Sequence, residues 1–399
     1  MIPSKTDVRQ IPPPLTTGSE LQSKLRHLAQ VLGNAGYESI VLSSEGALRW
    51  LTGMKHQLGD IAPSAASPVQ MLVRICNGDT FNITLTAKPF EMPRLKDELP
   101  PVFDGLPNVT VDFQETVPPV TTGMLLPDAE DYPELTGRII RPVPGGFEGN
   151  SFKKLEWLSR TSMRVLGKTA RQLEEGMDGL AVRGLILHNL MKCGVDANLV
   201  LVALYGQESH LHPIASTQYH VERGRWMKLV VGARYAEHIV SQSLMVNLGG
   251  DISAREAEVY RALQQAAVEY ADLYREGAGE ADIHAEMIAC FRQIEQDRGL
   301  HGFAQSATLH HPGGGTSPLG NRDRMLDPSG KRVCEPWTQF AINPVDALCD
   351  LKVELQGLIQ PQGKPPLILD MHADAPDIPF RTVTSRGGTK AVLPDLFII

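Results

Sequence analysis

Apolar and polar residues follow two different periods along the first part of the chain. From Leu21 to Leu32 apolar residues recur every three or four positions, which predicts an amphipathic helix that ends at the glycines following it. Short apolar runs at residues 37–42 and 69–75 are typical of strands instead. Residues 20–140 are therefore predicted to form a compact α/β unit.

A change in composition separates this unit from the rest of the chain. Periodicity is lost after Phe113, and residues 142–149 contain two prolines and three glycines, a composition typical of a linker between domains. A chain of 399 residues also suits two domains better than one. We predict a smaller α/β domain over residues 1–145 and a larger domain over residues 150–399.

The larger domain contains an internal repeat. Helical patterns cover residues 155–173 and 180–192, and a similar pair covers residues 256–274 and 281–296. Strand-like sequence follows each helix pair. Two α-α-β halves predict two similar lobes, related by a pseudo-twofold axis, that share one sheet and form a cleft where they meet.

A predicted hairpin lies in the first half of this repeat. Residues 226–232 and 239–246 are strand-like and are separated by a short turn. Because side chains alternate across a strand, Ser241 and Ser243 share one face and His238 lies on the other. We expect the two serines to face the cleft and His238 to point away from it.

Four segments of the larger domain follow one another in an order that resembles the creatinase/aminopeptidase P/methionine aminopeptidase (M24) superfamily. They are the hairpin, the run HHPGGGT at residues 310–316, residues 340–344 and residues 352–354. The resemblance implies the "pita-bread" fold for residues 150–399 and a creatinase-like domain for residues 1–145. Metal-dependent members carry Asp, Asp, His, Glu and Glu at five such places. In this chain the five residues are Val230, Ser241, His311, Asn343 and Glu354.

These replacements argue against the metal centre that the superfamily usually holds. Two metal ions roughly 3.5–4 Å apart need negatively charged bridging oxygens to offset their repulsion. Valine offers no donor atom, and serine and asparagine offer only neutral ones. We therefore expect no metal ligands and no resident cofactor.

Histidines provide the candidate catalytic groups. The His-Pro pair at residues 212–213 matches the place where the superfamily has a histidine that contacts substrate, and in creatinase the corresponding histidine is the catalytic acid/base. The resemblance therefore assigns that role to His212, since an imidazole exchanges protons near neutral pH. A buried Glu354 without metal needs a cationic partner to stay ionised, so we expect it to pair with His212 or His311.

The glycine-rich run after the histidines is typical of a binding loop, because glycine lets the backbone approach a ligand closely. It looks like the "HHQGGPTGY" segment of a subgroup of peptidase-like M24 proteins, whose arginine lies about one residue before Arg322. The resemblance implies that His311 is a hydrogen-bond donor to substrate. The candidate catalytic residues are His212, Glu354 and His311, and the candidate substrate-binding residues are His310, Ser241, Ser243, Asn343 and Arg322.

The leading functional hypothesis is a metal-independent, creatinase-like hydrolase that cleaves a C–N bond in a small amidine, amide or cyclic amino-acid-derived molecule. The first alternative is a non-catalytic pita-bread module that binds a partner, which would be expected to have lost its histidines. The second is an Xaa-Pro aminopeptidase-like metallopeptidase, which would need further ligands.

Charge and composition narrow the choice of partners. A formal net charge of −8 disfavours nucleic acid and anionic membranes. The start of the chain lacks the apolar run of a secretory signal, and the five dispersed cysteines suit neither a disulfide framework nor a zinc site, so we expect a cytoplasmic protein. Creatinase-like relatives are homodimers in which a loop reaches the neighbouring subunit's site. We place that loop at residues 54–67 and expect a homodimer.

Overall fold

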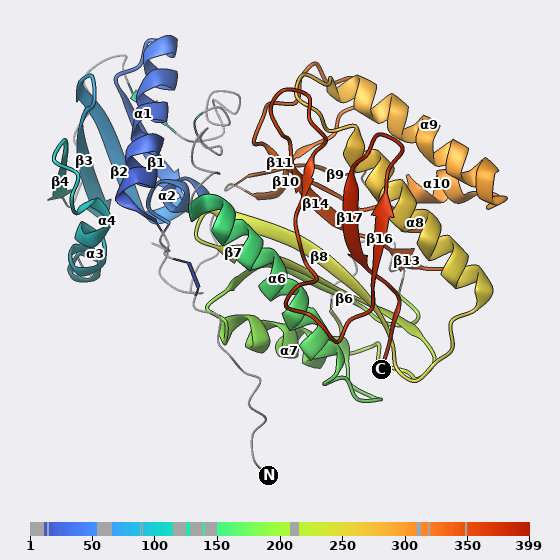
Figure 1. Ribbon diagram of the computed structural model, residues 1–399. Coiled ribbons are helices and arrows are strands. Elements are labelled where there is room, and N and C mark those ends of the chain that lie inside the picture. Colours follow the sequence, from blue (N-terminus) through green and yellow to red (C-terminus); the bar gives the residue numbers. More distant parts are fainter. Residues whose placement is uncertain are drawn as a thin grey trace.

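The computed structural model places a smaller α/β unit beside a larger one (Figure 1). It describes the following residues: 12–13, 16–53, 66–87, 89, 91–114, 125–127, 139, 150–207, 215–308, 313–317, 320–347 and 349–399. The boundary predicted between residues 145 and 150 and most of the predicted 54–67 loop lie outside these ranges.

The smaller unit is built on a five-stranded sheet in the order β4-β3-β2-β1-β5. Its first helix begins with a capping box, in which the side chains of Thr17 and Glu20 each accept the other's backbone N–H, and ends at Gly36 in the left-handed conformation that glycine adopts readily. The predicted helix and both predicted strands are confirmed. The elements are α1 (Gly18–Ala35), β1 (Ser39–Ser44), α2 (Glu45–Thr52), β2 (Ala66–Asn77), β3 (Thr80–Ala87), α3 (Met92–Glu98), α4 (Pro100–Phe103), β4 (Val109–Gln114) and β5 (Leu125–Pro127).

The first half of the larger unit is a helix pair followed by three antiparallel strands. The four-stranded sheet has the order β18-β8-β7-β6, in which the last strand of the chain lies parallel to β8. Both predicted helices and the predicted hairpin are confirmed. The elements are α6 (Asn150–Ala170), α7 (Gly179–Met191), β6 (Asp196–Ala203), β7 (Trp226–Tyr235), β8 (His238–Asn247) and β18 (Phe397–Ile398).

The second half repeats this plan with another helix pair and another sheet, in the order β10-β9-β11-β14-β15. The predicted helices at 256–274 and 281–296 are confirmed, so the pseudo-twofold α-α-β repeat is present (Figure 1). The elements are α8 (Ala254–Asp272), α9 (Glu280–Arg298), α10 (Phe303–Ala307), β9 (Gly313–Ser317), β10 (Gly320–Met325), β11 (Gln339–Ile342), β12 (Val345–Asp346), β13 (Leu351–Lys352), β14 (Leu355–Leu358), β15 (Leu367–Ile368), β16 (Phe380–Thr384) and β17 (Lys390–Pro394).

Among the residues that the structure describes, the two halves form separate sheets, so the predicted shared sheet is wrong for this part of the chain. Side-chain amides join β8 to the second sheet where backbone pairing would be expected. Gln356 Oε1 accepts the backbone N–H of Ser241 at 2.7 Å, and the carbonyl of Ile239 accepts from Gln339 Nε2 at 2.6 Å and from Gln356 Nε2 at 3.1 Å. These glutamines satisfy buried backbone groups of β8 that a neighbouring strand would otherwise pair.

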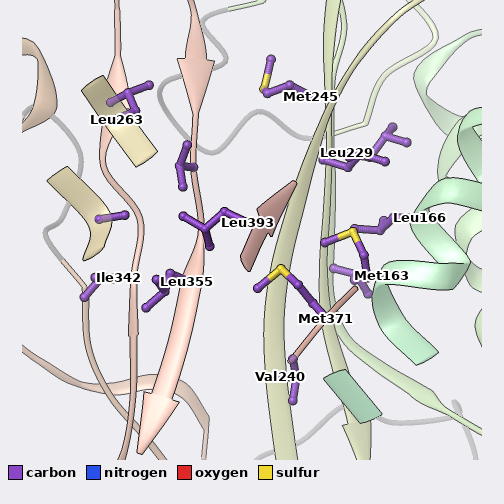
Figure 2. Close-up of a cluster of buried hydrophobic side chains, with 14 of the residues drawn as sticks. Met163, Leu166, Leu229, Val240, Met245, Leu263, Ile342, Leu355, Met371 and Leu393 are labelled. Carbon is purple, nitrogen blue, oxygen red and sulfur yellow. The ribbon is translucent and has the colours of Figure 1, made fainter. Parts of the chain in front are cut away.

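Buried apolar side chains form two separate clusters, one in each unit. The larger cluster lies between the helices and both sheets of the second unit, and this burial supplies most of the favourable free energy of folding. Figure 2 shows ten labelled members of it from α6, β7, β8, α8, β11, β14, β17 and the segment after β15: Met163, Leu166, Leu229, Val240, Met245, Leu263, Ile342, Leu355, Leu393 and Met371.

A buried ionic cluster joins the smaller unit to the turn of the β7–β8 hairpin. Lys24 Nζ of α1 lies 3.1 Å from Glu237 Oε1 in that turn. Lys154 Nζ of α6 lies 2.8 Å from Glu20 Oε1 of α1 and 2.9 Å from Glu237 Oε1. Burial would raise the pKa of Glu237, but the two ammonium groups outweigh it and hold that pKa well below its usual range.

His238 packs against this cluster, with Nε2 3.4 Å from Glu237 Oε1. It lies on the face of β8 that contacts α6 and the smaller unit, which confirms that it points away from the second half. Burial lowers the pKa of His238 to about 4, and the attraction of Glu237 offsets this only in part. The imidazole is therefore neutral in the folded protein at neutral pH.

We predict that His238 makes the protein less stable on mild acidification. The unfolded chain protonates this residue near pH 6.5 and the folded chain only near 4, so the free energy of unfolding falls as pH drops through that interval. The loss attributable to His238 is roughly 3 kcal/mol. Urea denaturation between these pH values should show a smaller decrease in the free energy of unfolding for His238→Gln than for the wild type. The control His220→Gln, at an exposed position, should show the same decrease as the wild type. Equal slopes for His238→Gln and wild type would contradict the prediction.

Candidate functional site

Alternate residues of the β7–β8 hairpin face the second half of the larger unit. Ser241 hydrogen-bonds residues of the second half, whereas its neighbour Gln242 donates from Nε2 to Ser159 Oγ of α6, 2.8 Å away on the opposite face. The register places Val230 opposite Ser243, so both share the face of Ser241. The orientation predicted for the two serines is confirmed.

Glu354 is the acidic residue of this face. It precedes β14, is buried, and its Oε1 accepts a hydrogen bond from Ser241 Oγ at 2.5 Å. Lys352 Nζ lies 3.8 Å from Glu354 Oε2, and both side chains are almost inaccessible. The carboxylate is thus fixed by a charge-assisted hydrogen bond from the Ser241 hydroxyl, which is strong because water is excluded, and it lies within ion-pair distance of the Lys352 ammonium group.

A second lysine shares this region. Lys228 of β7 is completely buried and precedes Val230 by two positions, so it lies on the same face. Burial, reinforced by the positive charge of Lys352, lowers the pKa of Lys228 to about 7 although Asp350 and Glu354 act to raise it. Among the described residues, Lys228, Lys352 and Glu354 therefore lie at or beside positions where the resemblance implies acidic ligands in metal-dependent members.

Asn343 and Ser243 complete the described part of the site. Asn343 is buried directly after β11, and the register that pairs Ile342 with Leu355 places it at the position adjoining Glu354. The Ser243 hydroxyl is also buried and has no hydrogen-bond partner among the residues that the structure describes. Four predicted site residues, from strands far apart in the sequence, are thus brought to one region.

Four other candidates are not placed. His212, His310 and His311 lie outside the described residues. Arg322 lies in β10, whose backbone is described without its side chain. The expected pairing of Glu354 with His212 or His311 stays a prediction, and in the described part of the chain its partners are Ser241 and Lys352.

The sequence interpretation missed both lysines, although a signal for them exists. Lys228 precedes Val230 by two residues, and Lys352 precedes Glu354 by two. Since side chains two apart on a strand share a face, the period that predicted the serines' orientation also places these lysines in the site. The superfamily's five ligand positions do not include these two lysines, so the resemblance did not point to them.

The residues present do not fit the metal centre that the resemblance implies. Val230 supplies no donor atom, Ser241 is already engaged by Glu354, and two lysines add positive charge where metal cations would need negative ligands. Among the described residues, three or more His, Cys, Asp or Glu side chains do not come together in a group that could hold a metal ion. Glu354 alone cannot hold the charge of two divalent ions.

Comparison with known proteins agrees with this architecture. The model of metallopeptidase family M24 matches residues 154–363, more than half of the chain. No curated protein matches. Dipeptidase PepE from Mycobacterium ulcerans superimposes with a TM-score of 0.62 at 16% identity, covering 90% of this chain and 98% of that one. The prolidase from Pyrococcus furiosus gives a TM-score of 0.60 at 14% identity, covering 86% and 98%.

Fold and site together define a pita-bread protein, an α/β architecture in which two α-α-β halves meet at a buried polar site. The chain belongs to metallopeptidase family M24. This match confirms the predicted superfamily and the predicted fold class. It also confirms the predicted enzyme class, a hydrolase that acts on a C–N bond, because a peptidase cleaves such a bond. The subgroup without metal-binding acids stays a prediction.

In the described residues no helix is long and apolar enough to span a membrane. A cytoplasmic location stays a prediction.

We predict that the purified protein contains much less than one Mn, Fe, Co or Zn ion per chain. Elemental analysis after dialysis measures this content, with a metal-dependent family member prepared in parallel as the control. Chelator should leave the melting temperature unchanged, because a ligand stabilises a fold only if it binds the native state. Stoichiometric metal that survives dialysis, or a melting temperature lowered by chelator, would show that the site holds metal.

Proposed function

We propose that this protein is a metal-independent, creatinase-like hydrolase that cleaves a C–N bond in a small amidine, amide or cyclic amino-acid-derived substrate. The observation that carries the proposal is the buried contact of Glu354 with Ser241 and Lys352. A carboxylate retained in the site, and held by a hydroxyl and an ammonium group, can orient a water or a substrate N–H without a metal ion.

The proposed reaction needs one residue that moves a proton and several that position the substrate. His212 accepts a proton from the attacking water as the water oxygen bonds to the substrate carbon, and then donates a proton to the leaving nitrogen as the C–N bond breaks. Glu354 orients the water or substrate, and His311 donates a hydrogen bond. Ser243 and Asn343 supply neutral hydrogen bonds.

The structural neighbours support the bond class. They include a dipeptidase, a prolidase and an X-Pro aminopeptidase, and such enzymes cleave amide C–N bonds. Metal-dependent Xaa-Pro hydrolysis is less favoured for this chain because Val230 and Asn343 replace acidic ligands of the superfamily.

We predict that His212→Ala lowers kcat by about 10²–10⁴-fold while leaving folding and substrate affinity largely intact, the usual effect of removing a proton-transfer group. The measurement is ammonia or amine release from a panel of small amides, amidines and cyclic amides. His311→Ala should raise KM more than it lowers kcat, and His220→Ala, at an exposed position, is the control. Wild-type turnover by His212→Ala would remove the proposed role. A panel without any reaction, together with a protein partner that binds this site, would favour the non-catalytic module.

We also propose that the protein is a homodimer whose 54–67 loop completes the neighbouring subunit's site. Light scattering should give a mass near twice 43.7 kDa. Deletion of the loop should lower turnover while the protein stays dimeric, if the loop acts on the partner's site without forming the main dimer contact. A monomer at micromolar concentration would rule out a shared site.

A further inference from the structure

An aromatic pair of the larger unit contacts the segment that precedes α1. The rings of Trp157 in α6 and Tyr235 at the end of β7 lie 4.7 Å apart between centroids and are inclined at 58°. Each of the two residues is only 8% exposed. Tyr235 Oη donates a hydrogen bond to the backbone carbonyl of Pro13, 2.5 Å away. The larger unit thus binds a segment that comes before the smaller unit in the sequence.

Both rings carry a hydrogen-bond donor. Burial, together with the nearby Glu237 carboxylate, raises the pKa of Tyr235, so its hydroxyl keeps its proton at neutral pH. Trp157 Nε1 is buried and has no hydrogen-bond partner among the residues that the structure describes, although buried polar groups are nearly always bonded. Two donors on adjoining aromatic rings suit a ligand that presents backbone carbonyls.

The sequence around Pro13 provides such a ligand. Residues 12, 13 and 14 are all proline, so this stretch has no backbone N–H. Proline fixes φ near −65°, and a residue that precedes proline is restricted to extended ψ values. Pro12 and Pro13 are therefore confined to the polyproline II conformation, which leaves its carbonyls without internal hydrogen bonds. Aromatic grooves bind such segments well because little conformational entropy is lost on binding.

The contacts beside the aromatic pair favour the chain's own segment as the occupant. Ser151 and Lys154 share one side of α6 with Trp157, at spacings of three residues. Ser151 Oγ donates to Glu20 Oε1 at 2.7 Å, and Lys154 Nζ lies 2.8 Å from the same oxygen. Glu20 lies in the first turn of α1, shortly after Pro13. This covalent connection gives the segment a high effective concentration at the aromatic pair.

We propose that Trp157 and Tyr235 form a binding site for polyproline segments, and that residues 12–13 of the same chain occupy it as a strap between the two units. The strap fixes the start of α1 against α6 and the β7–β8 hairpin, beside the buried ionic cluster of Lys24, Lys154 and Glu237. A proline-rich segment from elsewhere can bind only after the strap has left. This inference concerns the junction of the two units and does not rest on the proposed function.

The first experiment measures binding of a fluorescent peptide with the sequence of residues 8–17 to the full chain by anisotropy. The glycine-arm variant, which combines Pro12→Gly, Pro13→Gly and Pro14→Gly, should bind the peptide saturably, because a flexible arm competes poorly for the site. The wild type should bind at least about tenfold more weakly, because its own arm occupies the site. A control peptide with glycine in place of the three prolines should bind neither protein measurably. The substitutions precede α1, outside every described helix and strand, so we expect the variant to fold.

A hydroxyl deletion tests the contact itself. In the glycine-arm variant, Tyr235→Phe should weaken peptide binding severalfold, the effect of losing one hydrogen bond. Tyr205→Phe is the matched control, since it removes the same group from an exposed tyrosine after β6 and should leave binding unchanged. The binding site is ruled out if the control peptide binds as well as the proline peptide, or if Tyr235→Phe binds like its parent. Equal peptide binding by the wild type and the glycine-arm variant would rule out the strap.

A double-mutant cycle tests the strap without added peptide. Tyr235→Phe should lower the urea midpoint of the wild type and have little effect in the glycine-arm variant, where the hydroxyl has already lost its ligand. Tyr205→Phe should have the same effect in both backgrounds. Equal losses from Tyr235→Phe in the two backgrounds would show that its hydroxyl does not act on the arm, and would overturn the proposal.

Discussion

The hydrogen bonds that join β8 to the second half of the larger unit bring Ser241 and Glu354 of the candidate site together. Two glutamine side chains satisfy the backbone of residues 239 and 241, and the hydroxyl of Ser241 is bonded to Glu354. Because these bonds are buried, leaving any one of them unmade costs the full desolvation of a polar group. The two sheets are therefore fixed relative to each other by side chains and not by a shared backbone ladder, and the site lies on this junction.

Charge is arranged differently at the two ends of the same hairpin. At its turn, Glu237 is balanced by Lys24 and Lys154, and these bonds attach the smaller unit. Near its open end, Lys228 of β7 lies with Lys352 of β13 and Glu354, and burial lowers the pKa of Lys228 to about 7. Buried groups with perturbed pKa values occur both in structural ion clusters, such as the one at the turn, and in functional sites.

Sequence patterns predicted the helices, the hairpin and the repeat because each produces a regular spacing of apolar residues along the sequence. The side-chain orientation of Ser241 and Ser243 toward the second half followed from the two-residue period of a strand. The separate sheets could not be predicted in this way, since the glutamines that replace the ladder at 339 and 356 are distant in sequence from β8. The lysines were predictable from the same period but not from the superfamily's ligand pattern, which has no place for them.

If Val230 and Asn343 stand at the family's ligand positions, as the resemblance implies, the missing acids and the buried lysines are two parts of one physical change. With acidic residues at the positions of Val230 and Asn343, Lys228 and Lys352 would neutralise the ligands and compete with cations for them. Without those acids, metal ions at this place would meet, among the described residues, Lys228, Lys352 and the Glu354 carboxylate that Ser241 already bonds. The fold can tolerate this exchange because its stability comes from the apolar cluster around α6, α8 and the two sheets, which does not depend on a bound ion.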